Sequence, residues 1–306
     1  MEVRQATPED RDAVVAFTEN TWPERGGDYI PRVYDSWMES EGDGQRTFVL
    51  DPGAGDELAG IVQGVLVSEH EAWAQAMRVN PDYRGRRVSP RLTYALFDWA
   101  AERGASVCRN MVFSWNQAGL GQSRATGFDP CTEFRWAHPT PDPDATAEAD
   151  LVVDRDPETA WACYRRSSAS DHLRGLALDG GESWALSELT RETLARAAEE
   201  TSVLSLVDED AERAEATTFR VRDFERENEA GETEHWAEYG VGVWSDLPAA
   251  KALFAAIARD AASVGADRTR VLVPETVRYV SDSAYGQAGV SDEPDFVLEK
   301  DLSGRG

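Results

Sequence analysis

Residues 79–92 limit the possible folds of this chain more than any other segment, because they place a basic loop between an apolar strand and a helix. Their sequence is Val-Asn-Pro-Asp-Tyr-Arg-Gly-Arg-Arg-Val-Ser-Pro-Arg-Leu, and residues 78–91 hold five arginines and one acidic residue. Ser89 followed by Pro90 is typical of a helix start, with serine as the N-cap and proline in the first turn. A helix N-terminus offers unpaired backbone N–H groups to an anion. The segment therefore predicts a binding site for a phosphate-bearing ligand.

The rest of the chain is strongly acidic. Its 306 residues include 57 acidic and 31 basic side chains, for a formal net charge of -26, and Lys251 and Lys300 are the two lysines. Such a surface would repel a nucleic-acid backbone almost everywhere, which argues against nucleic acid as a partner. Dense carboxylates with few lysines indicate a cytosolic protein of a halophile, since molar salt screens charge over about 3 Å.

Cysteine usage and hydropathy exclude several other classes. Cys108, Cys131 and Cys163 are odd in number and have no paired spacing, which argues against a disulfide framework or a metal site. Cys108 falls in an apolar strand, where a small core residue is expected. The amino-terminal residues lack an apolar signal core, and no window approaches about 18 consecutive apolar residues. We therefore expect a cytoplasmic protein with no membrane segment and no metal.

The elements around the basic loop follow a definite order. A helix over residues 91–103 ends before Gly104, a strand over 106–115 is followed by Asn116, and a short helical segment ends at Gly127 and Phe128. Upstream of the loop the hydrophobic pattern predicts a strand at 3–6, helices at 8–20 and 33–38, and strands at 47–50, 58–67 and 72–79.

This order resembles the GNAT superfamily of acetyl-CoA-dependent N-acetyltransferases. The family's Arg/Gln-x-x-Gly-x-Gly/Ala loop corresponds here to Arg-Gly-Arg-Arg-Val-Ser at residues 84–89. The resemblance implies an α+β fold, with a mixed and mostly antiparallel sheet flanked by helices. It also implies acetyl-CoA as co-substrate and no metal.

The resemblance assigns the cofactor-binding residues. Backbone N–H groups of the loop are expected to hold the CoA pyrophosphate. Arg87 stands where the middle glycine is usual, and its guanidinium is expected to compensate for the added Cβ through a charge-assisted contact. The expected cofactor-binding residues are Met77, Val79, Arg84, Gly85, Arg86, Arg87, Val88, Ser89 and Asn116. Asn116, taken alone, could equally cap the next helix.

The catalytic groups depart from the family pattern. Ser123 stands where relatives commonly have a tyrosine that protonates the leaving thiolate, but a thiol of pKa about 8.5 can leave with the help of a hydrogen bond or water. Gln75 stands where many relatives have a glutamate base. We expect Glu71, acting through water, to take that role. A weak base favours α-amines, with a pKa of about 8, over lysine amines, with a pKa of about 10.4.

A second motif bears on the acceptor. Residues 28–37 read Asp-Tyr-Ile-Pro-Arg-Val-Tyr-Asp-Ser-Trp, which resembles the histidine N-acetyltransferase-like branch of the superfamily. This resemblance implies that Asp28, Tyr29 and Tyr34 contact the acceptor substrate. The helical spacing of Tyr34 and Trp37 also fits a stripe of core residues.

The second half of the chain repeats part of the first. Residues 139–150 contain three prolines and many acids, which predicts a linker between a GNAT domain at 1–138 and a second domain at 151–306. In the latter, a strand at 239–244, a helix at 247–264 capped by Asp246 and a strand at 270–273 follow the order of the first domain. Between Trp244 and the helix there is no glycine loop and no arginine. We therefore expect a degenerate second GNAT unit.

Together these patterns predict an acetyl-CoA-dependent N-acetyltransferase of a small amine, the α-amine of an amino acid, by direct transfer in a ternary complex. Two alternatives stay open at this point. One is a non-catalytic acetyl-CoA-binding regulatory protein, because Gln75, Arg87 and Ser123 depart from the family pattern. The other is a protein or peptide N-acetyltransferase.

The acidic composition leads to a first testable prediction. Lowering potassium chloride from molar to millimolar concentration should lower the melting temperature, because repulsion among the excess carboxylates grows as the screening length increases. Calorimetry across a salt series measures this. A melting temperature that does not depend on salt would rule out the halophile interpretation.

Overall fold

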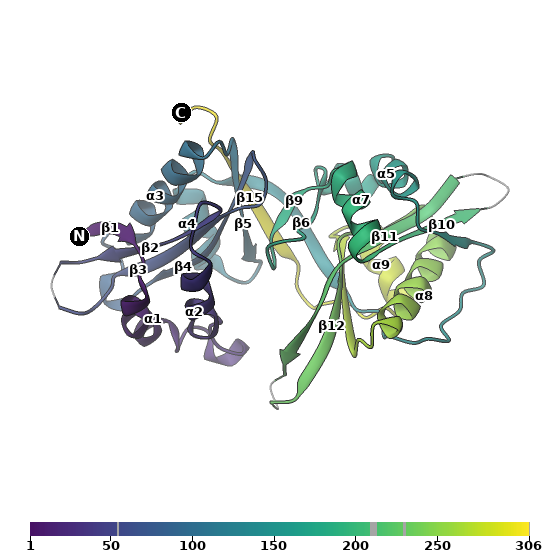
Figure 1. Ribbon diagram of the computed structural model, residues 1–306, viewed down its shortest axis with the longest axis horizontal. Helices are drawn as coiled ribbons and strands as arrows, with labels where there is room; N and C mark the ends of the chain where they lie inside the picture. Colours follow the sequence, from purple (N-terminus) through teal and green to yellow (C-terminus); the bar gives the residue numbers. More distant parts are fainter. Residues whose placement is uncertain (54, 209–212, 229–230, 306) are drawn as a thin grey trace. The chain divides into compact units, whose positions relative to one another are not determined.

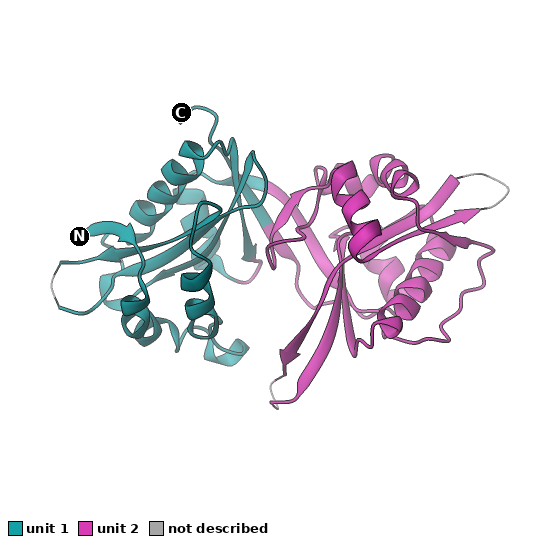
Figure 2. Ribbon diagram, in the orientation of Figure 1, with its two compact units in different colours: residues 1–112, 116–130, 297–306 teal, residues 113–115, 131–296 magenta. Residues whose placement is uncertain are grey.

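The chain forms two compact units in the computed structural model, which describes residues 1–53, 55–208, 213–228 and 231–305 (Figures 1 and 2). Unit 1 contains residues 1–112, 116–130 and 297–306, and unit 2 contains residues 113–115 and 131–296. Each unit has a β-sheet covered by helices. The candidate site lies in unit 1.

Unit 1 is built on a sheet with strand order β1-β2-β3-β4-β5-β15. Strands β1 to β4 are antiparallel, and β4 and β5 are parallel. The elements are β1 (Glu2–Gln5), η1 (Pro8–Asp10), α1 (Arg11–Thr18), η2 (Pro23–Arg25), α2 (Ile30–Ser40), β2 (Gln45–Asp51), β3 (Gly60–Leu66), β4 (Glu71–Val79), η3 (Pro81–Tyr83), α3 (Val88–Glu102), β5 (Val107–Phe113), α4 (Gln117–Ala125) and β15 (Asp295–Asp301).

Helices cover both faces of the unit 1 sheet (Figure 1). On one face, α3 packs against β3, where Gly60 and Gly64 leave room for Val88, Leu92 and Trp99. On the other face, the buried residues Val14, Ile30 and Tyr34 bring α1 and α2 against Val49 and Ile61 of the sheet. Alternate residues of β3 therefore face α3 on one side of the sheet and α1 and α2 on the other, because successive side chains of a β-strand point to opposite faces.

Unit 2 has the strand order β6-β14-β12-β11-β10-β7, with β13 paired to β11 and a separate β8-β9 pair. Strands β12 and β14 are parallel, and α8 connects them. The elements are β6 (Asp129–Ala137), β7 (Val152–Asp154), α5 (Pro157–Arg165), α6 (Ser168–His172), β8 (Leu176–Leu178), β9 (Leu186–Glu188), α7 (Arg191–Glu200), β10 (Ser202–Asp208), β11 (Arg213–Glu227), β12 (Thr233–Tyr239), β13 (Val243–Trp244), α8 (Leu247–Ser263), β14 (Arg268–Pro274) and α9 (Val277–Tyr285).

The last strand of the chain returns to unit 1. Residues 297–301 of β15 belong to unit 1, whereas residues 131–137 of β6 belong to unit 2, where they pair with β14. In unit 1 the carboxylate of Glu299 lies 3.5 Å from Arg109 Nε, and the Leu302 N–H donates to the Ser106 carbonyl at 2.8 Å. The bounds of the two compact units thus differ from those of the domains predicted at 1–138 and 151–306. The division of the chain into these domains at the linker 139–150 stays a prediction.

Two local predictions were wrong. Ser89 is not the N-cap of α3, because Arg87 adopts a left-handed conformation and the helix starts at Val88. The strand predicted at 239–244 is interrupted after Tyr239, since the chain leaves β12 at Gly240 and re-forms a short β13 that pairs with β11. Asp246 does cap α8, accepting a hydrogen bond from the Ala249 N–H at 2.9 Å.

The tight packing of β3 against α3 gives a second prediction. In Gly60→Ala the new Cβ would lie 2.7 Å from the Arg78 carbonyl oxygen and 2.8 Å from Val88 Cγ1, and the first of these is backbone. Overpacking of this kind should lower the free energy of unfolding by about 1–3 kcal/mol. The matched control is Gly44→Ala, whose Cβ would meet nothing within 4 Å. Equal stability of the two variants in urea unfolding would contradict this packing.

Candidate active site

The two parallel strands of unit 1 separate after a short paired stretch. Their register pairs are Glu71 with Val107, Ala72 with Cys108 and Trp73 with Arg109. Residues 74–79 of β4 and 110–112 of β5 extend beyond the last pair. Among the described residues, the register pairs of β4 with β5 end at Trp73 and Arg109, so the two strands diverge beyond this point, here called the opening.

A β-bulge in β4 lies at this opening. Gln63 of β3 pairs with Gln75 of β4, and Ile61 pairs with Arg78, so the register shifts by one residue around Ala76. Ala76 has a φ of 58°, in the left-handed region. Bulges redirect side chains and interrupt pairing, and they are frequent next to active sites. The predicted cofactor contacts Met77 and Val79 follow the bulge and are half-buried.

The arginine loop connects the end of β4 to α3. After η3, Gly85 and Arg87 both have positive φ, 75° and 60°, and α3 begins at Val88. The side chains of Arg84, Arg86 and Arg87 are exposed. The first N–H groups of the helix have no intrahelical acceptor, and the positive end of the helix dipole adds to the arginine charges. The loop can therefore hold a phosphate group.

Arg87 occupies a position that suits glycine. A non-glycine residue in the left-handed region costs roughly 1 kcal/mol or more, and its side chain makes no capping hydrogen bond within the described chain. This explains why glycine is usual at this place in the loop. Val88 is buried and Ser89 half-buried, so these two residues would meet an anion through their backbone N–H groups.

Asn116 caps the helix after β5. Its Oδ1 accepts a hydrogen bond from the Gly119 N–H at 3.0 Å. A Cβ at position 119 would lie 2.6 Å from the Asn116 side-chain nitrogen, so the cap depends on glycine there. Of the two readings of Asn116 left open by the sequence, the capping role is the one observed, and direct contact with CoA stays a prediction.

Ser123 lies on α4 and faces β5. It is 1% exposed, and its Oγ accepts a hydrogen bond from Asn110 Nδ2 at 2.9 Å. Asn110 is the first residue of β5 beyond the paired stretch. Sequence reasoning missed Asn110, although asparagine is depleted in strands and its place in the middle of β5 could have marked it.

Glu71 lies in a buried ion pair at the start of β4. It is the first residue of β4, within the paired stretch, and it is 5% exposed. Its carboxylate forms an ion pair with Arg109 and accepts a hydrogen bond from the Ser68 hydroxyl at 3.0 Å. The carboxylate is therefore engaged with two neighbouring side chains, and its role as the base stays a prediction.

Gln75 lies closer to the opening. Its Nε2 donates to Gln63 Oε1 at 2.7 Å, and Gln63 Nε2 donates to Thr47 Oγ1 at 3.2 Å. Gln63 and Thr47 are fully buried. This chain of amides fixes the Gln75 side chain on the face of the sheet that α1 and α2 cover.

The predicted acceptor residues fall into different environments. Asp28 is buried and forms an ion pair with Arg78, with Oδ2 2.6 Å from Nε, and the Arg78 guanidinium also lies 4.3 Å from the centre of the Trp22 ring. Tyr29 is half-buried and packs edge-to-face on Trp37. The Asp28–Arg78 pair thus ties the segment before α2 to β4.

Tyr34 is a core residue and not an acceptor contact. It is 0% exposed, and its hydroxyl donates to the Thr7 carbonyl at 2.7 Å. Burial raises the pKa of this phenol well above its ordinary value. The core stripe, which the helical spacing also allowed, was the correct interpretation for this residue.

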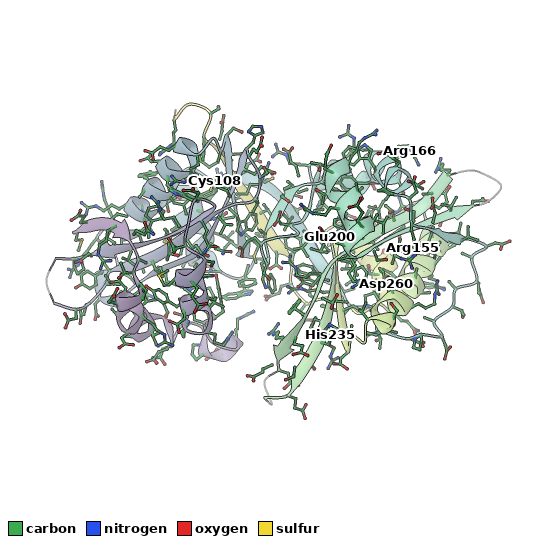
Figure 3. The ribbon with its side chains drawn as sticks, viewed as in Figure 1. Cys108, Arg155, Arg166, Glu200, His235 and Asp260 are labelled. Atoms are coloured by element: carbon green, nitrogen blue, oxygen red, sulfur yellow. The ribbon has the colours of Figure 1, made fainter. Side chains whose placement is uncertain are left out.

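The remaining candidate groups are inert. Cys108 is fully buried in β5 (Figure 3), and burial raises the pKa of its thiol, as expected for a core residue. Among the described residues, no group of three or more His, Cys, Asp and Glu side chains could hold a metal. In the same part of the chain, every helix is too short or too polar to cross a membrane.

Comparison with known proteins bears directly on this geometry. The model of the acetyltransferase (GNAT) family matches residues 11–121, which include β4, the arginine loop, α3 and β5. Residues 11–121 are therefore similar to the GNAT acetyltransferase family. Members of this family are N-acetyltransferases that use acetyl-CoA. The match does not reach the second half and does not single out a branch.

Solved structures extend the likeness to the whole chain. A GCN5-related N-acetyltransferase from Sphaerobacter thermophilus is similar over 98% of this chain and 95% of its own, with a TM-score of 0.62 and 13% identity. A putative acetyltransferase from Thermoplasma acidophilum is similar over 98% and 100%, with a TM-score of 0.57 and 14% identity. These similarities confirm the mixed, mostly antiparallel GNAT-like fold. No curated protein matches the sequence significantly.

The environment of Glu71 gives a third prediction. Glu71→Gln should lower the free energy of unfolding by up to about 3 kcal/mol, because it leaves the buried Arg109 with Glu299 as its remaining ion-pair partner. Where activity is measurable, the pH dependence of kcat/KM should keep its shape. The exposed neighbour Glu69→Gln serves as the control. Loss of the acidic limb of the profile in Glu71→Gln, without loss of stability, would restore Glu71 as the base.

Proposed function

We propose that this protein is an acetyl-CoA-dependent N-acetyltransferase of a small amine, the α-amine of an amino acid, acting by direct transfer in a ternary complex. The observation that carries the proposal is the separation of β4 from β5 beyond Trp73 and Arg109, next to the arginine loop. This arrangement gives an extended ligand both a phosphate contact and a row of backbone groups along one strand.

In this proposal the phosphates of acetyl-CoA lie at the loop. The backbone N–H groups of Arg84, Gly85, Arg86, Val88 and Ser89 and the guanidinium of Arg87 bind them, and Met77 and Val79 flank the rest of the cofactor. The exposed arginines support this, because they form a cationic group on a chain of net charge -26. Charge-assisted hydrogen bonds to phosphate are about twice as strong as neutral ones.

The proposed reaction needs little acid–base assistance. The neutral acceptor amine attacks the thioester carbonyl, the C–S bond breaks, and the sulfur leaves with its electron pair while the amine proton passes to water. Glu71 is engaged with Arg109, and Gln75 cannot accept a proton. An acceptor of low amine pKa is therefore favoured, since an α-amine needs only about 1.4 kcal/mol to be neutral at pH 7.

We propose further that unit 2 is a degenerate GNAT unit, built from the same strand-helix-strand arrangement. Its parallel pair stays in register up to Tyr239 and Val271, where β12 ends. Just beyond, the Gly242 N–H donates to the Leu272 carbonyl at 2.8 Å, which keeps the chain against β14. Within the described residues, no such contact follows the last pair of β4 and β5, and this difference supports a second unit without an acetyl-CoA site.

The histidine N-acetyltransferase-like branch, a halophilic source and a cytoplasmic location remain part of the proposal. The motif at residues 28–37 and the acidic composition support the first two. A non-catalytic regulator that binds acetyl-CoA is the alternative favoured by a specific observation, because no general base is apparent among the side chains described here. A peptide acetyltransferase differs from the main proposal in acceptor size.

The cofactor side of the proposal is tested by charge reversal. Acetyl-CoA should raise the melting temperature in high salt, because a ligand stabilises the state that binds it, and Arg84→Glu should abolish this shift. Arg166→Glu, which makes the same charge change at an exposed arginine of unit 2 (Figure 3), should leave the shift intact. Absence of binding heat in calorimetry, or equal affinity in Arg84→Glu, would exclude the proposed site.

The acceptor side is tested by thiol release with a panel of free amino acids, histidine included, and of lysine-containing peptides. We expect amino acids to accelerate release, with a rate that rises with pH until the α-amine is neutral and then levels. Release with peptides alone would refute the small acceptor. Binding of acetyl-CoA without release for any amine would instead leave the regulatory alternative.

A further inference from the structure

A hydrogen-bonded side-chain pair lies where β5 separates from β4. Asn110 is one residue beyond the last paired residue, Arg109, and its Nδ2 donates to Ser123 Oγ on α4. Helix α4 is also joined to α3 by a hydrogen bond from Gln122 Nε2 to Thr93 Oγ1 at 3.2 Å. The pair therefore borders the opening on the side that α3 and α4 cover.

Both members of the pair have unused hydrogen-bonding capacity. Asn110 Oδ1 is buried and has no partner within the described chain. The bond from Asn110 uses a lone pair of Ser123 Oγ and does not engage the hydroxyl proton. A buried polar group without a partner costs about 1–3 kcal/mol. An unused acceptor and an unused donor side by side therefore indicate a ligand that supplies the matching groups.

The thiol end of CoA carries such groups. Its cysteamine portion has an amide N–H joined to the sulfur by a short ethylene chain. We propose that Asn110 and Ser123 together hold this cysteamine end, with Asn110 accepting the amide N–H and orienting the Ser123 hydroxyl toward the leaving sulfur. This inference rests on the proposed acetyl-CoA site and adds Asn110, a positioning residue for Ser123, to it.

The orientation of the Asn110 amide decides the role of Ser123. With Nδ2 toward Ser123, the hydroxyl proton is directed away from Asn110 and remains free for the sulfur. With the amide reversed, Oδ1 would accept that proton and none would be left. The assigned orientation gives the sulfur a hydrogen-bond donor as the C–S bond breaks. The sulfur leaves with the electron pair of that bond, and the proton stays on Ser123. Asn110 and Ser123 therefore gain and lose no proton in the step.

A titration of bound CoA tests the pair without knowledge of the acceptor. The ultraviolet absorbance of the thiolate of CoA, bound to the full-length protein, is followed against pH. In the wild type, a hydrogen bond to the thiolate should lower the pKa of the bound thiol, and Ser123→Ala and Asn110→Leu should each raise it by about one unit. The double variant should match Ser123→Ala, because Asn110 acts on the sulfur through Ser123.

Two further variants separate this role from packing. Cys108→Ala alters a buried side chain two positions earlier in β5, and it should change the melting temperature without moving the thiol pKa. Asn110→Asp keeps the size of the side chain but can only accept a hydrogen bond, so it should take the Ser123 proton and raise the thiol pKa at least as far as Asn110→Leu. It supplies the test if Asn110→Leu does not fold.

The outcomes distinguish this inference from the proposed function. CoA binding with the same thiol pKa in all variants would overturn the inference and leave the acetyl-CoA site standing. Additive shifts in the double variant would overturn the positioning role of Asn110. Failure of CoA to bind at all would overturn both. Where an accepted amine is found, kcat should fall about 10-fold in Ser123→Ala and Asn110→Leu, with acetyl-CoA affinity changed much less.

Discussion

The central constraint in this protein is how far two parallel strands stay paired. In unit 1, pairing between β4 and β5 stops at Trp73 and Arg109, and the bulge at Ala76 turns the rest of β4 out of register. In the proposed function, backbone groups along this part of β4 contact the ligand. In unit 2 the corresponding strands remain paired, and Gly242 continues the contact with β14. The register pairs thus end within both strands in unit 1, whereas in unit 2 a backbone hydrogen bond follows the last pair.

Buried ion pairs hold β4 and β5 together within their paired stretch. Glu71 and Arg109 join β4 to β5 within the paired stretch, and Glu299 of β15 adds a second carboxylate to Arg109. Removing one member of such a group is costly, because a buried charge is left without its partner. The carboxylate that the sequence offered as a base therefore joins two strands in this geometry, and in the proposed reaction the acceptor's own pKa carries more weight than an enzyme base.

The sequence predicted local features well and long-range ones poorly. The arginine loop, α3, and the Asp246 cap follow from residues within one or two turns of each other, and they were found in their places apart from the exact start of α3. The burial of Tyr34 and the ion pairs of Asp28 and Glu71 depend on partners many positions away in the chain, which periodicity cannot specify. Asn110 was missed because its importance depends on where β4 and β5 separate.

The return of β15 to unit 1 has a consequence for how the protein is made. The strand that contacts β5 through Glu299 and Leu302 is synthesised last, after all of unit 2. Domains generally fold in the order in which they leave the ribosome, but unit 1 cannot complete its sheet in that order. It must wait, with β5 exposed as an edge, until β15 has been translated after unit 2. Unit 2 is thus a long insertion in unit 1, and its synthesis delays completion of the unit 1 sheet. Premature termination that removes β15 takes a strand from the first unit and not from the second.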